Sequence, residues 1–243
     1  MRTTRIYHPD ELSINVEIIL EKNSTLHVRD VLRMQVGDAI ILFNGNGLDY
    51  LGTIVRIDKK AVRVVLHATE KRHTISPLKI HLAQGLCRGE KMDFAIQKAT
   101  ELGVTEITPI ISEYCNVRLN TERLQKKQQH WQKVAASACE QCGRTDLLRI
   151  NPSMDFNTWI KQKFSGIAYI LDPSATKSID KITTSIPSQV ILLIGPEGGF
   201  TNNEIQYAIL HQYHTILLGP RILRSETAGL VAVTLLQHLY GDI

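Results

Sequence analysis

The stretch "LLIGPEGGFTNNE", residues 192–204, places a run of branched apolar residues directly before a turn and a helix start. An apolar run that ends in Gly-Pro predicts a buried strand leaving its sheet. Thr201, followed three residues later by Glu204, predicts a capping box at a helix N-terminus. The turn then lies at the carboxyl end of a strand, where open α/β sheets bind ligands. An ordinary strand-to-helix connection has the same pattern, so a second stretch has to decide.

That second stretch is "LLGPRILRSETAGLVAVTLLQHLY", residues 217–240. It leaves a short apolar strand through Gly219-Pro220 and enters an apolar helix after Ser225. Two such exits from neighbouring strands would form two walls of one pocket. No G-x-x-x-x-G-K-[ST] phosphate loop occurs in the chain. We therefore expect backbone groups and apolar side chains to hold the ligand, which suits an adenosine compound without a polyphosphate.

Strand and helix patterns alternate through the rest of the chain after Pro77, which predicts an α/β domain with a mostly parallel sheet. Thr121 is the expected cap of the longest helix. The expected strands cover residues 78–86, 104–111, 166–173, 189–195 and 214–219, and the expected helices cover residues 90–102, 121–144, 201–213 and 225–240.

The residues before this region have a different texture. Three short β-type runs, residues 39–44, 50–58 and 61–68, are separated by turn signals, and a helix is expected at residues 23–34 with Asn23 or Ser24 as its cap. This spacing predicts a small antiparallel barrel or sandwich. The change of texture near residues 71–78 divides the chain into two predicted domains, residues 1–72 and 73–243.

Composition sets broad limits. Of the 243 residues 43% are hydrophobic and 21% charged, which is typical of a soluble globular protein. We find neither a membrane-length apolar run nor a secretory signal and expect a cytoplasmic protein. The net charge of +4 permits an anionic partner without establishing one. The single C-x-x-C, Cys139 and Cys142, has no second close Cys or His pair, so we expect packing rather than a metal site.

Several segments, taken in chain order, resemble the RsmE family of 16S ribosomal RNA uridine-N3 methyltransferases, a family of the knotted SPOUT class. They are "RIYH" (5–8), "VLRM" (31–34), "IQKATELGVTEITPI" (96–110), "ACEQCGR" (138–144), "LLIGPEGGF" (192–200) and "LGPRILRSETA" (218–228). One departure is Tyr114 in "SEYCNVR", where relatives often carry Arg after the Ser-Glu pair.

The resemblance implies a PUA-like β-barrel that binds RNA, followed by an α/β methyltransferase domain with a C-terminal trefoil knot. It also implies a homodimer, 16S ribosomal RNA as partner, within the small ribosomal subunit or free of it, and neither a membrane nor a metal. S-adenosylmethionine is the implied cofactor. Its implied binding residues are Ile194, Gly195, Pro196, Glu197, Gly198, Leu217, Leu218, Gly219, Ile222, Leu223, Ser225, Glu226, Thr227 and Ala228.

Two of these positions have alternative interpretations. Glu197 either accepts a hydrogen bond from the cofactor or positions a helix, and a plain turn carboxylate is the rival interpretation. Thr227 either touches the ligand or caps the terminal helix. At the glycines, a Cβ would obstruct close approach of the backbone to the adenosine.

Methyl transfer to uracil N3 requires an exposed base, loss of the N3 proton and stabilisation of the uracil anion that develops. Arg224 and Arg144 are the catalytic candidates for holding the uracil oxygens or a nearby phosphate. Glu140 is either a proton acceptor or the i, i+4 ion-pair partner of Arg144, and we favour the pair.

Candidate RNA contacts in the first domain are Arg2, Arg5, Arg29 and Arg33. Arg29 and Arg33 share a helical face, which also suits a solvated surface, and the resemblance supports Arg5 and Arg33 alone. Two rival functions remain: an RNA-binding module that does not transfer methyl groups, and a nucleotide-binding enzyme with the same Gly-Pro turns.

The terminal helix suggests association. Its leucines and valines point in nearly every direction, so a second surface is expected to cover part of them unless the helix is buried within one chain. The residues concerned are Leu230, Val231, Val233, Leu235, Leu236 and Leu239.

Overall fold

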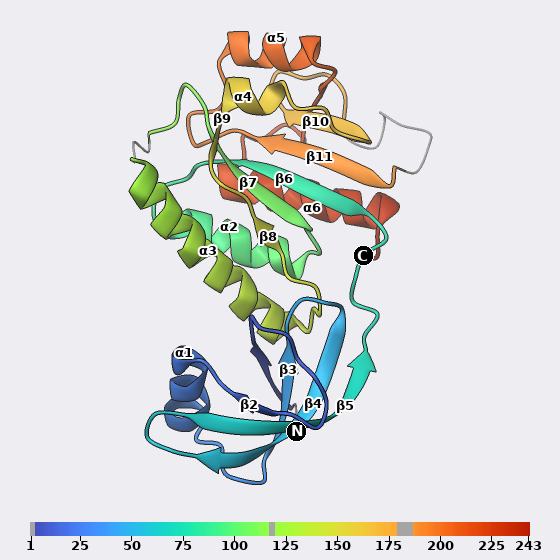
Figure 1. Ribbon diagram of the computed structural model, residues 1–243. Helices are drawn as coiled ribbons and strands as arrows, with labels where there is room; N and C mark the ends of the chain where they lie inside the picture. The colour runs from blue at the N-terminus through green and yellow to red at the C-terminus, as the bar shows by residue number, and fades with distance from the viewer. Residues whose placement is uncertain (1–2, 117–119, 179–186) are drawn as a thin grey trace. The chain divides into compact units, whose positions relative to one another are not determined.

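The computed structural model describes residues 3–116, 120–178 and 187–243 (Figure 1). The contacts between residues divide the chain into two compact units. The first comprises Met1–Ile75 and Ala136–Leu147, and the second Ser76–Ala135 and Leu148–Ile243. The first unit therefore includes a segment from the middle of the chain, which the change of sequence texture does not indicate. No helix in the described ranges is long and apolar enough to cross a membrane.

The first unit contains a five-stranded sheet in the order β1-β3-β4-β5-β2. The predicted runs form β3 (Ala39–Phe43), β4 (Leu48–Ile57) and β5 (Val62–Lys71), with antiparallel pairing from β3 to β5 and on to β2 (Glu17–Ile19). The first strand, β1 (Thr4–Tyr7), pairs in parallel with β3. Alternating burial along β5 places Val62, Val64 and Leu66 in the core of this sheet, as expected of a strand with one solvated face.

The helix expected at residues 23–34 is shorter and starts earlier. It consists of α1 (Lys22–Leu26) and a π-helical turn, η1 (His27–Val31). Its N-cap is Glu21, so the predictions of Asn23 or Ser24 as the cap are wrong. Arg33 follows the helix with φ of 53°, a left-handed conformation that ends a helix. The predicted helical face shared by Arg29 and Arg33 is therefore not present.

A second sheet lies in the second unit, in the order β12-β10-β11-β6-β7-β8, with β9 also paired to β7. Every pairing in it is parallel, as predicted. Its central strands are buried on both faces, and β11 is buried from Val190 to Ile194. The strands are β6 (Lys79–Gly85), β7 (Glu106–Ile111), β8 (Arg149–Ile150), β9 (Met154–Asp155), β10 (Ile167–Leu171), β11 (Gln189–Ile194) and β12 (His214–Ile216).

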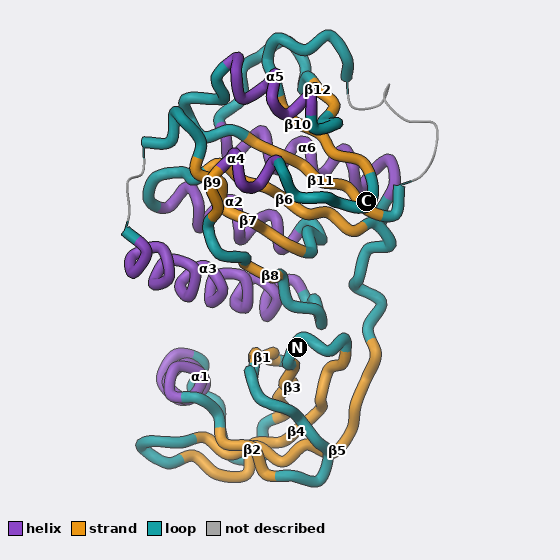
Figure 2. The backbone as a smooth tube through the Cα atoms, turned by 45° about the horizontal axis from the view of Figure 1, so that its top comes forward, coloured by secondary structure: helices purple, strands orange, loops and turns teal. Residues whose placement is uncertain are grey.

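Helices cover both faces of this sheet (Figures 1 and 2). On one face, α2 (Glu90–Glu101) packs against α6 (Ser225–Tyr240), and Trp131 of α3 (Thr121–Cys142) joins the same core. On the other face, α4 (Phe156–Ile160) and α5 (Asn202–Leu210) bury Phe156, Trp159 and Ala208. Layers on both faces are the arrangement that a parallel sheet requires, because its central strands are mostly apolar on both faces.

Helix starts follow the sequence only in part. The capping box of α5 is confirmed, with Thr201 Oγ1 accepting from the Glu204 amide at 3.2 Å and Glu204 accepting from the Thr201 amide at 2.9 Å. The α3 prediction is wrong by one residue, because Asn120 accepts from the Arg123 amide and Thr121 is already helical. The N-cap of α6 is Arg224, so Thr227 lies inside the helix and does not cap it.

Candidate active site at the Gly-Pro turns

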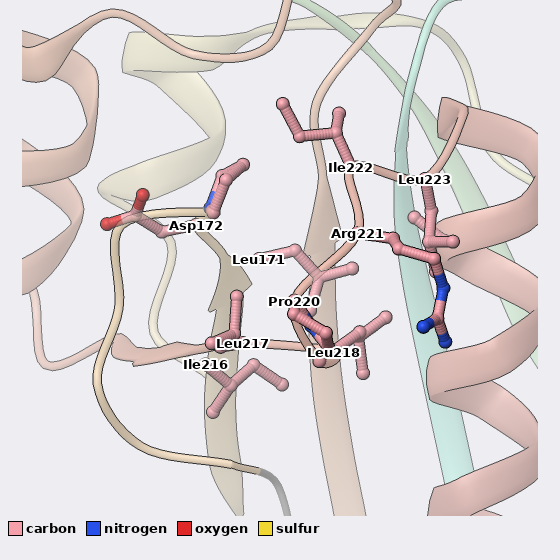
Figure 3. A pocket seen from close by; sticks show the side chains of 12 residues that line it. Leu171, Asp172, Ile216, Leu217, Leu218, Pro220, Arg221, Ile222 and Leu223 are labelled. Atoms are coloured by element: carbon pink, nitrogen blue, oxygen red, sulfur yellow. The ribbon is translucent and has the colours of Figure 1, made fainter.

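An apolar hollow of about 150 Å³ opens where β10 and β12 end (Figure 3). Both strands end at the same edge of the parallel sheet, the edge at which ligands bind in this architecture. Its lining residues are Leu171, Asp172, Pro173, Ile216, Leu217, Leu218, Gly219, Pro220, Arg221, Ile222, Leu223 and Ala228.

The hollow contains part of the predicted cofactor site. Leu217, Leu218, Gly219, Ile222, Leu223 and Ala228 line it, whereas Ile194, Gly195, Pro196, Glu197, Gly198, Ser225, Glu226 and Thr227 are not among its lining residues. The sequence reasoning missed the contribution of β10, although the run "GIAYILDP" already indicated a strand that ends in Asp172-Pro173. Asp172 brings the one carboxylate of the lining, and its Oδ1 accepts from the amide and hydroxyl of Ser174 at 2.8 and 2.7 Å.

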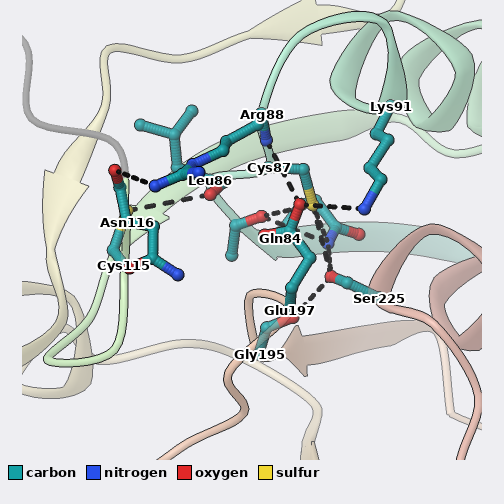
Figure 4. A network of polar contacts seen from close by, with 11 residues as sticks. Gln84, Leu86, Cys87, Arg88, Lys91, Cys115, Asn116, Gly195, Glu197 and Ser225 are labelled. Carbon is teal, nitrogen blue, oxygen red and sulfur yellow. Dashed lines mark hydrogen bonds and ion pairs between the residues drawn. The ribbon is translucent and has the colours of Figure 1, made fainter.

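The turn after β11 is connected to α6 through Ser225 (Figure 4). The Ser225 hydroxyl donates to the carbonyl of Gly195, and Gln84 Nε2 donates to the same hydroxyl oxygen at 2.8 Å. The thiol of Cys87 lies 3.4 Å from it, and burial raises the pKa of this thiol to about 11. Ser225 is thus the junction of three segments: the end of β6, the turn after β11 and the start of α6.

The turn after β11 packs closely against the backbone of Gly85, at the end of β6, a glycine that was not predicted to matter from the sequence. A Cβ added to Gly85 would lie 2.3 Å from the backbone nitrogen of Pro196, a distance that no real Cβ tolerates. At Gly195 an added Cβ would meet the backbone of Gly199 at 3.1 Å. Packing within the turn itself is therefore one reason for glycine at 195, and the obstruction of the adenosine by a Cβ there stays a prediction.

Glu197 is held by residues that begin α2. It accepts from the Arg88 amide at 3.4 Å and from Lys91 Nζ at 3.2 Å (Figure 4). Burial alone would raise its pKa, but hydrogen bonds from its own amide, from Lys91 and from Arg88 outweigh that effect and lower it. Of the alternatives weighed for Glu197, these contacts favour the carboxylate that positions a helix.

The catalytic candidates Arg144 and Glu140 lie in the first unit and already have partners there. The side chain of Arg144 is buried and pairs with Asp146, with Nε 3.1 Å from Oδ1. Glu140 accepts from the Tyr7 amide at 2.9 Å, and burial raises the pKa of its carboxyl. The ion-pair partner that the structure gives Arg144 is thus Asp146 rather than the predicted Glu140.

Arg224 differs from these two residues. It is exposed at the N-cap of α6, in the second unit, directly after the residues that line the hollow. No ion pair to Arg224 is present within residues 3–116, 120–178 and 187–243. Its guanidinium is consequently open to solvent or to a ligand.

Arg5 does not fit its predicted role as a phosphate contact. Its side chain is 3% exposed and pairs with the fully buried Asp49, with Nη2 2.6 Å from Oδ1. The same guanidinium donates to the carbonyls of Cys139 and Arg144 at 2.8 and 3.0 Å, and it lies over the ring of Phe43. Together with the bond from Nε to Asp49 Oδ2, these bonds use four of the five N–H donors of Arg5 inside the first unit, and the side chain is buried there, so Arg5 is not placed to contact RNA.

The other three predicted RNA contacts differ in their placement. Arg33 is exposed, and Arg29 is paired with Asp30 through Nε and Oδ1 at 2.6 Å. Arg2 lies outside the described residues. Among the predicted RNA contacts that the structure describes, Arg33 is therefore the one whose exposed side chain could bind a phosphate of RNA.

Comparison with known proteins agrees with this geometry. The family described as RNA methyltransferase domain matches residues 74–237, and the RNA methyltransferase PUA domain matches residues 20–66. A ribosomal RNA small subunit methyltransferase E from Buchnera aphidicola (Schizaphis graminum) is 39% identical over 100% of this chain and 98% of its own. The Bacillus subtilis protein of that name is 30% identical over 89% of each chain.

Solved structures extend the likeness to three dimensions. A putative methyltransferase from Legionella pneumophila, in complex with SAM, has a TM-score of 0.96 and 38% identity over the whole of both chains. A ribosomal RNA small subunit methyltransferase E from Neisseria gonorrhoeae, bound to S-adenosyl methionine, has a TM-score of 0.92 and 34% identity, again over both whole chains. The predicted fold class, a knotted α/β methyltransferase domain behind a PUA-like β-domain, is confirmed. The chain belongs to the ribosomal RNA small subunit methyltransferase E family.

Proposed function

We propose that this protein transfers the methyl group of S-adenosylmethionine to N3 of a uridine in 16S ribosomal RNA, in the cytoplasm. The observation that carries the proposal is the apolar hollow at the ends of β10 and β12, in a chain whose relatives of the same fold were crystallised with this cofactor. The named relatives act on ribosomal RNA of the small subunit, which supports the substrate.

The residues of the hollow fit the cofactor. Leucine and isoleucine walls suit a flat adenine ring, and the exposed backbone around Gly219 suits its polar edge. Asp172 offers a carboxylate to ribose hydroxyls. An added Cβ at Gly219 would have no neighbour within 4 Å, so the backbone there faces open space that a ligand can occupy. When bound, the cofactor supplies a methyl group that its sulfonium has already activated.

The protein must then position the uracil and stabilise the negative charge that develops on it. We assign this role to Arg224, because its guanidinium is exposed next to the hollow. Arg144 and Glu140 we assign to the structure of the first unit, given their bonds to Asp146 and to the Tyr7 amide. Arg33 remains the proposed phosphate contact of the PUA-like domain.

A second copy of the chain completes the proposed enzyme. Val231, Leu235 and Leu239 recur at every fourth position of α6 and are 36–38% exposed. They form an apolar stripe on the solvent side of a helix whose other face is buried. We propose that this stripe is covered by the partner subunit in a homodimer, because water would otherwise meet three large apolar side chains in a row.

The decisive experiment incubates the protein with methyl-labelled S-adenosylmethionine and small ribosomal subunits, or naked 16S ribosomal RNA, from cells that lack this activity. Digestion to nucleosides and mass spectrometry should reveal N3-methyluridine. An unlabelled product with intact RNA binding would instead support an RNA-binding module. Calorimetry with S-adenosylhomocysteine and with ATP addresses the nucleotide-binding alternative, since only the former should bind.

A further inference from the structure

A second hollow, of about 480 Å³, lies at the ends of β7 and β9 and at the start of α5. We call it the Ser112 hollow. It lies at the carboxyl edge of the parallel sheet, as the cofactor hollow does, but is built from other strands. Its volume falls in the range of small-molecule sites, about 300–1,000 Å³. It is lined by Ile111, Ser112, Glu113, Asp155, Phe156, Asn157, Asn203, Glu204 and Tyr207.

The hollow contains a polar group that has no partner. Ser112 is 7% exposed, and its Oγ makes no hydrogen bond and is covered by neighbouring atoms in the free protein, so the side chain has to turn about its Cα–Cβ bond to bring the hydroxyl to a ligand in the hollow. Buried hydroxyls in folded proteins are almost always bonded to protein or water, so an unbonded one on the wall of a hollow points to a ligand or to water. The sequence pattern does not reveal this feature, because Ser112 simply follows the last residue of β7.

Two of the three carboxylates on the wall are already engaged. Asp155 caps α4 by accepting from the amides of Asn157 and Thr158. Glu204 accepts from the amides of Thr201 and Glu113. Lys, Arg and His are missing from the lining, so a phosphate would meet negative charge without a counter-ion. Among the described residues, no group of three or more His, Cys, Asp or Glu side chains is placed to hold a metal ion.

The groups left to a ligand are the hydroxyls of Ser112 and Tyr207, the amides of Asn157 and Asn203, and the carboxylate of Glu113. Together they offer both donors and acceptors, and they surround an apolar floor that includes Phe156. A nucleobase with its ribose presents complementary donors and acceptors without charge. Glu113 also lines an adjoining hollow with Tyr114 and Gly198, the latter in the turn after β11. The two hollows thus connect the Ser112 wall with a turn of the candidate active site.

We infer that the Ser112 hollow binds the base and ribose of a nucleotide that neighbours the methylated uridine in the RNA. This inference rests on the proposed function, which identifies the RNA that is bound, and it adds a second binding site to that function. The phosphates of that nucleotide stay outside the acidic wall. The unbonded hydroxyl of Ser112 then gains its partner when RNA binds.

The first test compares Ser112→Ala with the unaltered protein. Since the hydroxyl has no partner to lose in the free protein, the melting temperature should stay the same or rise. The KM for RNA should rise about fivefold, the scale of one lost hydrogen bond, while kcat and the affinity for S-adenosylhomocysteine stay unchanged. Ser112→Thr, which keeps the hydroxyl, should restore most of the KM. An unchanged KM in Ser112→Ala would show that the hydroxyl stays buried and does not contact RNA, and would overturn the inference.

The chain provides a matched control at the start of α5. Asn202 and Asn203 are both exposed, but Asn203 alone lines the hollow. Asn203→Ala should weaken the binding of RNA, and Asn202→Ala should leave it unchanged. Equal effects of the two substitutions would attribute any loss to the helix start and would count against the hollow.

The third test removes the base from the RNA instead of the side chain. Substrate fragments with an abasic site on either side of the target uridine are compared with the intact fragment. One abasic site should weaken RNA binding to the unaltered protein at least as much as Ser112→Ala does, because it removes every contact of that base, and Ser112→Ala should then cause little further loss with that RNA. Additive losses at both positions would mean that the base lies elsewhere.

The same variants and RNA fragments can be compared by binding alone. Fluorescence anisotropy of a labelled RNA fragment, with S-adenosylhomocysteine present, measures the affinity without methyl transfer. If the unaltered protein methylated no RNA, the proposed function would fail. The anisotropy series would still decide whether Ser112 and Asn203 contact RNA.

Discussion

At the scale of single residues, the pair of Arg5 and Asp49 has the largest expected effect on stability. Asp49 is fully buried and forms ion pairs with both Arg5 and Arg72. The Nε atom of Arg72 lies 2.6 Å from Asp49 Oδ2. Arg5→Ala would leave a buried carboxylate with one partner fewer and would remove one donor from each of two carbonyls, those of Cys139 and Arg144. We expect a loss of about 3 kcal/mol in the free energy of unfolding, measured with urea. Arg29→Ala, which breaks an exposed pair, should lower the free energy of unfolding far less than Arg5→Ala does, and similar losses for both variants would contradict the structural role of Arg5.

Glu140 provides a prediction on pH. Burial raises the pKa of its carboxyl in the folded protein above its ordinary value. Protons therefore bind the folded state more tightly, and the contribution of Glu140 to stability is present below the ordinary pKa of glutamic acid and is lost as the pH rises through the folded pKa. Glu140→Gln keeps an acceptor for the Tyr7 amide and removes the charge. The variant should gain stability over the unaltered protein at pH 8 and lose that advantage near pH 4, in urea titrations at both values.

At the scale of elements, Ser225 holds three segments together, and cofactor affinity should depend on it. Ser225→Ala removes the hydrogen bonds that Gln84 Nε2 and the Gly195 carbonyl make with this hydroxyl next to α6. We expect about a tenfold loss in affinity for S-adenosylhomocysteine by calorimetry, because the residues that line the hollow precede Ser225 directly. Ser225→Thr keeps the hydroxyl and should retain most of the affinity. Identical affinities for Ser225→Ala and the unaltered protein would show that the contacts of Ser225 do not contribute to cofactor binding.

The elements also show what a sequence can predict. The strand β11 and the capping box of α5 follow from local patterns, an apolar run and a Thr-x-x-Glu spacing, and both are confirmed. The burial of Arg5 depends on Asp49 and on carbonyls more than 130 positions away, so no local pattern reveals it. The strand β9 has two residues and β8 has two, too few for a period to be visible. Asp172 could have been predicted as a lining residue of the hollow, because its strand was expected from the sequence. What the sequence does not indicate is that Asp172 lies near Leu217.

At the scale of the whole molecule, the exposed stripe of α6 predicts a dimer. Leu235 is 36% exposed, whereas Leu236 is fully buried, so Leu235 is the outward residue of the two and the one to substitute. Leu235→Glu should place an unpaired charge in the interface and yield a monomer with reduced activity, as seen by light scattering. Leu210→Glu, at a 79% exposed apolar residue at the end of α5, should remain dimeric. A fully active monomer of the unaltered protein would overturn the interface.

The way in which the first unit is assembled from the chain has a consequence for protein synthesis. Arg5 in the first strand is bonded to the carbonyls of Cys139 and Arg144, and residues 136–147 belong to the same compact unit. Its β-strands leave the translating ribosome early but cannot complete their core of polar contacts until the chain has grown past Leu147. At about 5–20 residues per second, this delay lasts on the order of several seconds. During that interval the guanidinium of Arg5 lacks the carbonyls of Cys139 and Arg144, so the nascent first unit should be more sensitive to proteases than the finished one.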